Sequence, residues 1–434
     1  MMNRRKFLLN AANAGLALGI SGLPLVVRAQ AVTYDVVVVG GGMAGATIAK
    51  YLRIWSNYTL KVALIEKNLN YTSNIMSNEV LTGKRVVSSL SYGYTNLVNK
   101  YGVVRIQGTV NSIDPDAHTV SYDATTIGYR SLVLAPGLEF DLWPGVSPGQ
   151  YDTLIPHAWQ AGAQTTLLRT QIKNMIAGAG KNVVITIPKA PYRCPPGPYE
   201  RACVIADWLR LYKAGSKVIV LDENAEVQAE KANFMNAFGG LYGYTVDYRP
   251  GIKITNVSAL PTRQVTYTQT VNSVTETVTV DAAVLNPIPP QRAPKLLADT
   301  GLLDGKFAPV NPVTFESSLE PDVYIIGDAC FAGSIPKAGH IANQEAKTCA
   351  NAILLALSGY GETSNFTPVL NSACFTPVTS TLATWLSAVY QFDGAYYIQS
   401  SHNGGKAIAA TTASADNYSD MTKWFKTLMG DTFS

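Results

Sequence analysis

The hydrophobic pattern alternates between short, continuous apolar runs and segments with helical spacing. Residues 34–39 form an almost unbroken β-branched run, which is typical of a strand that is buried on both faces of a parallel sheet. A glycine turn follows, and then an alanine-rich helix at residues 44–54 and a second apolar run at residues 60–65. This order predicts a βαβ unit.

Similar runs continue along the chain. Further strands are predicted at residues 103–107, 131–134, 183–187, 217–221, 284–286 and 323–326. Residues 341–358 contain neither Gly nor Pro and predict one long helix. Thr and Val alternate between residues 263 and 280, which favours antiparallel strands, and residues 304–312 and 360–368 are predicted to be loops.

Residues 1–31 have the features of an export signal. The twin-arginine segment RRKF (4–7) precedes a mildly apolar stretch at residues 8–26, and AQA (29–31) offers small residues for cleavage. We therefore expect export of the folded protein by the twin-arginine route to the periplasm. The alternative is a membrane anchor, which Asn10, Asn13 and several glycines in this stretch disfavour.

Composition limits the remaining function classes. The chain has 434 residues, enough for two or three domains, and 47% of them are hydrophobic. The formal charge is +4, and residues 1–31 contain four basic residues and no acid, so the mature chain is formally neutral. No basic patch suggests nucleic acid as a partner. No later segment has a long unbroken apolar run, so we expect no membrane span in the mature chain.

The turn after the first strand carries the first functional motif. Gly40, Gly42 and Gly45 form a GxGxxG pattern between a predicted strand and a predicted helix. Such glycines let the backbone approach a pyrophosphate, which then lies at the helix N-terminus. Glu66 ends the second strand 21 residues after Gly45, where a carboxylate accepts hydrogen bonds from a ribose. The four residues predict a dinucleotide site.

Two later motifs favour FAD as that dinucleotide. The segment YIIGDA (324–329) ends a strand in Gly327 and Asp328, and it resembles the second FAD signature of glutathione-reductase-like flavoproteins. Its Asp binds the ribityl chain in that superfamily, whereas an Asp in isolation is as often a helix cap. The segment LVLAPG (132–137) resembles the crossover of the same superfamily. The order of the three motifs favours FAD over NAD.

The middle of the chain has no second glycine motif. The strand at residues 183–187 continues into KAPYRCPPGPYER (189–201), and its prolines lack the N–H donors that a pyrophosphate needs. A nicotinamide cofactor is therefore disfavoured.

Cys194, in this turn, is the candidate for redox chemistry. It lies between Arg193 and the beginning of a helix, so we expect a positive field that lowers its pKa and favours the thiolate. The alternative is a buried structural cysteine. Glu200 could accept or return a proton, although a single Glu at this spacing is more often a solvated helix residue.

These segments carry a family resemblance. PYRCPPGPYERA (191–202), SNEV (77–80), PPQRA (289–293), TFESS (314–318) and IGDAC…PKAG (326–339) resemble the flavoprotein subunit of flavocytochrome c sulfide dehydrogenase. The resemblance extends along nearly the whole mature chain. Sulfide:quinone oxidoreductases are more distant relatives.

The resemblance implies an α/β fold with two Rossmann-like domains of the glutathione-reductase type and a smaller C-terminal domain. We expect the FAD-binding domain at residues 32–148 and 289–360. A second Rossmann-like domain that lacks a NAD motif would occupy residues 149–288, and the C-terminal domain residues 361–434.

The resemblance also implies a mechanism. Cys194 and Cys374 correspond to the two cysteines of a redox-active disulfide, which hydrosulfide attacks to leave a persulfide and a thiolate. The electrons then pass to FAD and on to a c-type cytochrome subunit, and Glu200 resembles a glutamate that handles protons. The substrate would be a small inorganic sulfur compound. Cys203, Cys330 and Cys349 receive no role, and we expect them to be small buried hydrophobes.

Further cofactor contacts follow from the same resemblance. Lys337 is expected near the flavin pyrimidine, where a cation stabilises the reduced anion. The other predicted contacts are Ser77, Asn78, Val110 and Trp424.

Two positions depart from the family pattern. Asn74 stands where many members attach the flavin through cysteine, so non-covalent FAD is expected. His340 replaces a family aromatic residue on the path from flavin to haem.

Two other functions remain open. A quinone-reducing enzyme would need a membrane-docking surface, and Met421, Trp424, Phe425, Leu428 and Met429 have the spacing of an apolar helix face. The other alternative is a redox-inert flavoprotein that serves as a scaffold for a cytochrome, with a structural Cys194–Cys374 disulfide.

Overall fold

The first sheet is built around β1 (Thr33–Val39), which pairs in parallel with β2 (Val62–Ile65) and with β8 (Thr125–Leu134). Val36 lies opposite both Val62 and Ser131, and the three valines that follow it on β1 are buried. The full order is β5-β2-β1-β8-β7-β6, and β19 also pairs with β8. This confirms the βαβ unit, in which α1 (Met43–Trp55) connects the first two strands.

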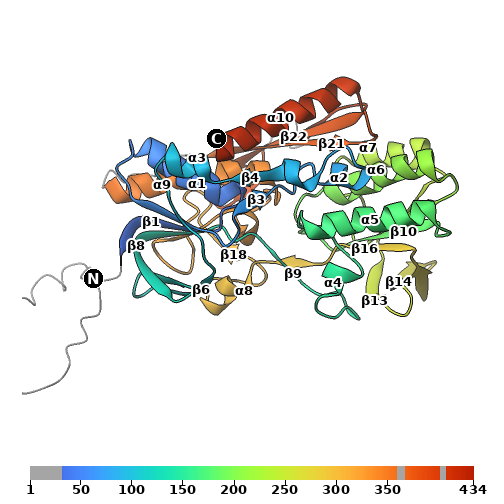
Figure 1. The fold of residues 1–434 in the computed structure, drawn as a ribbon, viewed down its shortest axis with the longest axis horizontal. Coiled ribbons are helices and arrows are strands. Elements are labelled where there is room, and N and C mark those ends of the chain that lie inside the picture. The colour runs from blue at the N-terminus through green and yellow to red at the C-terminus, as the bar shows by residue number, and fades with distance from the viewer. Residues whose placement is uncertain (1–31, 359–366, 401–406) are drawn as a thin grey trace, which may run out of the picture. The chain divides into compact units, whose positions relative to one another are not determined.

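The computed structural model describes residues 32–358, 367–400 and 407–434 (Figure 1). Internal contacts separate Met1–Val32 from Thr33–Ser434, and the fold described below is that of the second unit. The predicted export signal at residues 1–31 lies outside the described residues, as does most of the predicted loop at residues 360–368.

Within the part of the chain that the structure describes, four further strands complete the first sheet. They are β5 (Val104–Ile106), β6 (Val110–Asp114), β7 (Thr119–Tyr122) and β19 (Val323–Ile325). β6 and β7 are antiparallel, whereas β5 and β19 continue the parallel part of the sheet. The predicted helix at residues 341–358 is α9 (Gly339–Ser358), and it packs against α1. The sequence did not predict the hairpin of β6 and β7, because its burial is irregular.

The second sheet is entirely parallel. It has the order β12-β11-β10-β16, with β12 (Val246–Arg249), β11 (Lys217–Asp222), β10 (Asn182–Ile187) and β16 (Val284–Pro287). Val183 and Ile185 join the core under α5 (Ala163–Ala177) and α6 (Gly197–Tyr212), whereas Val184 faces a separate core. The two helices therefore cover only one face of this sheet (Figure 1).

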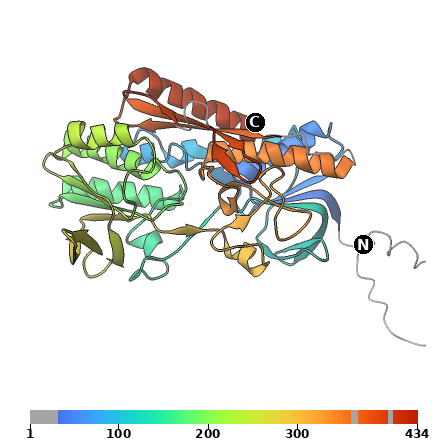
Figure 2. The ribbon, with the colours of Figure 1, turned by 180° about the vertical axis from the view of Figure 1, so that it is seen from behind.

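An antiparallel sheet packs on the other face. It consists of β13 (Lys253–Ser258), β14 (Gln264–Val271) and β15 (Val274–Asp281), and it confirms the alternation predicted at residues 263–280. Its buried residues join Val184 in the second core. Figure 2, from behind, shows these strands on the side away from α5 and α6.

The C-terminal segment forms an antiparallel sheet beneath a helix. β21 (Val369–Pro377), β22 (Ala383–Phe392), β23 (Tyr397–Gln399) and β24 (Ile408–Ala409) precede α10 (Ala415–Phe433). Leu370, Ala388, Met421 and Phe425 belong to the same hydrophobic core as β1. The segment predicted as a separate C-terminal domain therefore shares its core with the first sheet.

Short elements connect these parts. They are β3 (Asn70–Thr72), α2 (Asn78–Thr82), η2 (Val87–Leu90), β4 (Ser91–Gly93), α3 (Thr95–Asn99), β9 (Glu139–Phe140), α4 (Gln150–Thr153), α7 (Lys231–Asn236), η3 (Ala237–Leu241), β17 (Gln291–Arg292), α8 (Lys295–Asp299), β18 (Ala308–Pro309), η4 (Gly327–Ala329) and β20 (Cys330–Phe331). Residues 304–312 are a loop as predicted, except for β18 and two isolated bridges, Asp304 with Phe307 and Val310 with Ser317. Within the described ranges, no helix is both long and apolar enough to cross a membrane.

Candidate active site

A groove of about 660 Å³ extends from the glycine turn after β1 to the loop before α6. Its lining includes predicted site residues that are far apart in the sequence: Gly40, Gly42, Glu66, Ser77, Asn78, Cys194, Glu200, Gly327, Asp328, Cys374 and Trp424. The tertiary structure therefore brings together most of the residues that the motifs suggested. The groove is large enough for a cofactor.

The glycine turn requires glycine at two of its three predicted positions. Gly40 has a φ of 96°, and a Cβ there would lie 2.3 Å from the carbonyl oxygen of Ala135. A Cβ on Gly45 would lie 1.8 Å from the carbonyl oxygen of Gly40, so Gly45 shapes the turn without lining the groove. Gly42 is the N-cap of α1 and leaves space on the groove side.

Glu66 lies at the carboxyl end of β2, as predicted, and orders the turn. Its carboxylate accepts hydrogen bonds from the backbone N–H of Gly41 at 2.8 Å and of Asn68 at 2.7 Å. The Asn68 side-chain amide donates a third bond at 2.8 Å. A carboxylate has about four lone-pair sites, so this arrangement still leaves one acceptor site for a ribose.

The residues present fit a dinucleotide with a negatively charged pyrophosphate. α1 begins at the groove without an acidic residue in its first turn and without a side-chain cap, so its first N–H groups face the groove. Arg193 adds a positive charge, and its buried Nε has no partner among the described residues. Its guanidinium lies 3.6 Å from the carboxylate of Asp328.

Glu200 occupies the first turn of α6 and is held by Asn78. The Asn78 side-chain amide donates to Glu200 Oε1 at 2.8 Å, and its Oδ1 accepts from Arg201 Nε at 2.8 Å. Burial raises the pKa of Glu200 to about 8, although the bond from Asn78 partly offsets this effect. Glu200 can therefore bind and release a proton near neutral pH.

Arg201 is a site residue that the sequence did not reveal. Its guanidinium is almost completely buried and donates to Asn78, Asn286 and the carbonyl oxygens of His157 and Ala158. Burial lowers its pKa to about 9. In the sequence, only its position next to Glu200 in PYER (198–201) could have suggested that Arg201 belongs to the site.

Cys194 lies in the loop between β10 and α6 in a strained conformation. Its φ is 59°, in the left-handed region that few residues other than glycine adopt. Its N–H donates to the carbonyl oxygen of Lys337 at 2.8 Å, and its own carbonyl accepts from Gly197 N at 2.9 Å. A Cβ on Gly197 would lie 2.9 Å from Cys194 Sγ, so glycine leaves room for the thiol.

The prediction that a positive field lowers the pKa of Cys194 is wrong. Burial, followed by the nearby Cys374 and Glu200, raises this pKa well above the ordinary value. Arg193 and the start of α6 act in the opposite direction but are outweighed, because desolvation penalises the thiolate more than they stabilise it. Cys194 is therefore a protonated thiol at neutral pH.

Cys374, on β21, lines the same groove as Cys194. Burial raises its pKa to about 12, with Glu230 as the next cause. All five cysteines are free thiols, so the predicted Cys194–Cys374 disulfide is not formed in this structure. The two cysteines nevertheless line one groove, and Cys374 adds to the cost of ionising Cys194, as expected for a pair in its dithiol form.

Lys337 and Val110 do not line the groove, and the cofactor contacts that the resemblance implied for them stay predictions. Lys337 Nζ donates to the carbonyl oxygens of Asp328 and Cys330, at 2.7 and 2.9 Å, and lies 3.7 Å from the ring centre of Phe307. It lines a second cavity and not the groove. Val110 begins β6 and lines neither cavity.

Asn74, His340 and Trp424 do line the groove. Asn74 Oδ1 accepts from the backbone N–H of Ala161 at 2.7 Å, which ties this position to the loop before α5. Trp424 stands edge-on to His340, with ring centres 5.9 Å apart. His340 Nδ1 accepts from Ala373 N at 3.0 Å, and burial lowers its pKa, so the ring is neutral.

The second parallel sheet lacks an open nucleotide site at the matching turn. Asp222 ends β11, where a carboxylate would meet a ribose. Here it accepts hydrogen bonds from the hydroxyls of Tyr199 at 2.8 Å and Tyr248 at 3.0 Å. Two tyrosine hydroxyls of the chain itself therefore take the hydrogen-bonding position on this carboxylate that a ribose hydroxyl would use.

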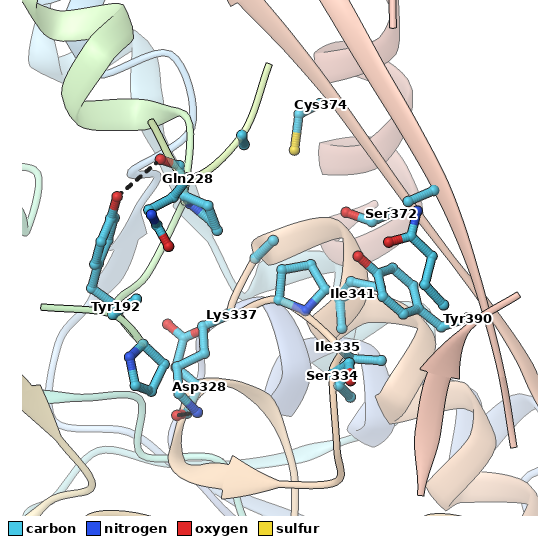
Figure 3. Close-up of a pocket in the computed structure, with 18 of the residues that line it drawn as sticks. Tyr192, Gln228, Asp328, Ser334, Ile335, Lys337, Ile341, Ser372, Cys374 and Tyr390 are labelled. Carbon is cyan, nitrogen blue, oxygen red and sulfur yellow. Dashed lines mark hydrogen bonds between the residues drawn. The ribbon is translucent and has the colours of Figure 1, made fainter. Parts of the chain in front are cut away.

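A second cavity of about 420 Å³ adjoins the groove at Cys374 (Figure 3). Cys374 lines both cavities, whereas Cys194 lines only the groove. The second cavity also contains Cys330, Glu230 and Glu345, for which the sequence suggested no role.

Two known families match parts of the chain. Residues 165–289 match the family described as sulfide dehydrogenase (flavocytochrome c) flavoprotein chain, central, and residues 34–183 match the pyridine nucleotide-disulphide oxidoreductases. The first match includes Cys194 and Glu200. The first match confirms the resemblance, and the second confirms the fold class that the resemblance implied.

Solved structures show the same fold. The sulfide:quinone oxidoreductase of Aquifex aeolicus aligns with a TM-score of 0.73 at 19% identity, over 93% of this chain and 91% of its own. A ferredoxin reductase from Rhodopseudomonas palustris aligns with a TM-score of 0.58 at 19% identity, over 83% and 89%. Lactococcus lactis thioredoxin reductase follows with 0.54 at 14% identity, over 75% and 99%.

Proposed function

The chain is a flavoprotein of the flavocytochrome c sulfide dehydrogenase type, and from this premise we propose that it oxidises sulfide to sulfane sulfur with Cys194 and Cys374. The observation that carries the proposal is that these two cysteines line one groove together with the glycine turn and Glu200. We also propose that the electrons leave to a c-type cytochrome.

The first step is thiol–disulfide exchange. Hydrosulfide attacks Sγ of Cys374 in the oxidised pair, the S–S bond breaks, and Cys194 leaves as a thiolate with both bonding electrons. Cys374 then carries the new S–S bond as a persulfide. We assign the attack to Cys374 because it also lines the second cavity, which offers an approach that does not pass through the groove.

Desolvation makes the released thiolate reactive. Burial raises the pKa of Cys194, so its thiolate is poorly stabilised and a strong electron donor. When the Cys194 thiolate forms a new S–S bond, to Cys374 or to its sulfane sulfur, two electrons are released, and FAD, when bound in the groove, would accept them. Glu200, with a pKa of about 8, takes up the proton of hydrogen sulfide or of a thiol and returns it.

We propose non-covalent FAD, because the Asn74 amide cannot form a thioether and is hydrogen-bonded to Ala161. Acid precipitation of the purified holoprotein should release all of the flavin into the supernatant. Flavin that stays with the denatured protein would contradict this prediction.

The alternative of a quinone-reducing enzyme depended on an exposed apolar helix face that could dock on a membrane. Met421, Phe425, Leu428 and Met429 are buried in the core shared with β1, and Trp424 lines the groove. The apolar face of α10 therefore packs inward.

Rapid mixing of the anaerobic holoprotein with sulfide tests the proposal. We expect flavin bleaching to slow at least about 100-fold in Cys194→Ser, because the leaving thiolate is lost. Cys203→Ser is the matched control, since Cys203 is buried in α6 and lines neither cavity. Equal bleaching of Cys194→Ser and wild type would refute the role of the cysteine pair, whereas no bleaching of either protein would favour a redox-inert scaffold. Reduction of added cytochrome c, compared with a short-chain quinone, identifies the acceptor.

A further inference from the structure

The second cavity is bounded by the loop at residues 328–338, the loop at residues 190–196 and the strands β21 and β22. Figure 3 shows the sulfur of Cys374 directed into it, with Lys337 and Asp328 on the opposite side. Most of its remaining lining is apolar: Ala332, Ile335, Ile341, Leu386 and Ala388. Beside its charged groups, this lining offers an apolar surface that suits a polarisable sulfur ligand.

The alternation of β21 explains why Cys374 reaches this cavity. Side chains of a strand point alternately to its two faces. Ser372 lines the second cavity, whereas Ala373 and Phe375 line the groove. Cys374 is directed to the side of Ser372, and it is one of the residues that line both spaces. A sulfur atom added to Cys374 Sγ would therefore extend into the second cavity.

A second thiol lines the same cavity. Cys330, in β20, is only 4% exposed, and its Sγ donates to the carbonyl oxygen of Gly327 at 3.2 Å. Its Sγ also lies 3.9 Å from Glu345 Oε1. The proposed sulfide oxidation uses neither Cys330 nor Glu345.

Glu345 is arranged as a proton acceptor for Cys330. The backbone N–H of Gly327 donates to its Oε2 at 2.6 Å, which leaves Oε1 for the thiol. Burial raises its pKa to about 8, so it exchanges protons near neutral pH. Burial and Glu345 itself also raise the pKa of Cys330 well above its usual value, so the resting thiol needs a base to become a nucleophile.

We propose that the second cavity binds zero-valent sulfur and that Cys330 accepts the sulfane sulfur atom from the Cys374 persulfide. This inference rests on the proposed function, which supplies that persulfide. It assigns a chemical role to a cysteine outside the redox pair, and it gives the sulfur product a place away from the flavin groove.

The transfer is balanced without a further oxidant. Glu345 takes the proton of Cys330, and the thiolate attacks the outer sulfur of the Cys374 persulfide. The S–S bond of Cys374 breaks as a new S–S bond forms on Cys330. Cys374 leaves as a thiolate and recovers a proton, so one persulfide and one thiol give one thiol and one persulfide.

The test combines flavin spectroscopy with peptide mass spectrometry. The holoprotein is mixed anaerobically with sodium sulfide and oxidised cytochrome c, blocked with iodoacetamide, digested and analysed. We expect the peptide with Cys330 to carry one additional sulfur atom, which dithiothreitol removes. In Cys330→Ser this label is lost and less sulfane sulfur remains bound per protein, while the first flavin reduction stays as fast as in wild type.

Cys349→Ser is the matched control, because Cys349 is fully buried in α9 and lines neither cavity. It should keep the label on Cys330. Flavin that is reduced by sulfide without any extra sulfur on wild-type Cys330 would overturn this inference and leave the proposed function intact. Flavin that sulfide does not reduce would instead refute the proposed function. The wild-type measurement decides the question even if Cys330→Ser does not fold.

Discussion

Cys194 and Glu200 enter the groove from the loop before α6 and from its first turn, and burial raises the pKa of both. Proximity to Arg193 suggested a stabilised thiolate, but the cost of removing a charge from water exceeds that attraction. Because the thiol is neutral and the carboxyl titrates near pH 8, the rate of the proposed reaction should depend on the ionisation of Glu200. The same combination recurs at Cys330 and Glu345.

Glu200→Gln should remove a step in the pH profile. Glu200 is protonated below about pH 8, so its contribution as a base appears only as the pH rises through that value. We expect the ratio of wild-type to variant rates of flavin reduction by sulfide to grow to about 100-fold above pH 8 and to fall toward one at lower pH. The ionisation of hydrogen sulfide is common to both proteins and cancels in the ratio.

The side-chain amide of this variant would still accept the hydrogen bond from Asn78, so the fold of the site is preserved. Glu226→Gln is a suitable control, because Glu226 is exposed and its carboxylate pairs with Lys231 on the surface. A ratio that does not change with pH would show that Glu200 is not the base.

At the scale of single elements, β21 is held in place by a carboxylate from another part of the fold. Glu230, the N-cap of α7, accepts hydrogen bonds from the hydroxyls of Thr376 at 2.7 Å and Thr384 at 2.5 Å. Thr376 lies two residues after Cys374 on the same face of β21. Glu230 therefore couples the position of Cys374 to the second parallel sheet.

Thr376→Val should weaken this connection. Valine has the same shape but no hydroxyl, so Glu230 loses one donor in a fully buried place. We expect the free energy of unfolding to fall by about 1–3 kcal/mol, measured by chemical denaturation of the holoprotein. Thr275→Val, at an exposed position of β15, should change it by less than about 0.5 kcal/mol. Equal effects at the two positions would contradict the role of Glu230.

The pattern of residues predicted some elements better than others. Strands buried on both faces, such as β1 and β10, were predicted within one residue at each end, because a continuous apolar run requires burial wherever it occurs. β21 and β22 were not predicted. Their burial alternates irregularly because they pack on the first sheet's core, on α10 and against a cavity.

At the scale of the whole molecule, the groove combines segments that are separated by hundreds of residues. The turn after β1 forms one end, and Cys194 and Cys374 come from different sheets and loops at the other. A cofactor bound there would touch most parts of the fold. Export of an already folded holoprotein is consistent with such a site, and we propose that the twin-arginine segment at residues 4–7 directs it to the periplasm.

Replacing Arg4 and Arg5 together by lysine tests this proposal. We expect the variant to remain in the cytoplasm of a bacterial host as an uncleaved, flavin-containing precursor, whereas wild type appears in the periplasmic fraction. Fractionation followed by immunoblotting measures both pools. Arg28→Lys is the control, since it keeps the charge near the cleavage site and should leave export unchanged. Undiminished export of the double variant would exclude the twin-arginine route.

The sequence by itself determined the βαβ unit, the glycine turn and the acid at the end of β2, and it carried the family resemblance. Each of these depends on residues that are neighbours in the chain or follow a fixed local period. Only the tertiary structure decided the ionisation of Cys194, the coupling of Cys374 to Glu230 and the meeting of Cys374 and Cys330 at one cavity. Desolvation and contact depend on what packs around a residue, and that is set by distant parts of the chain.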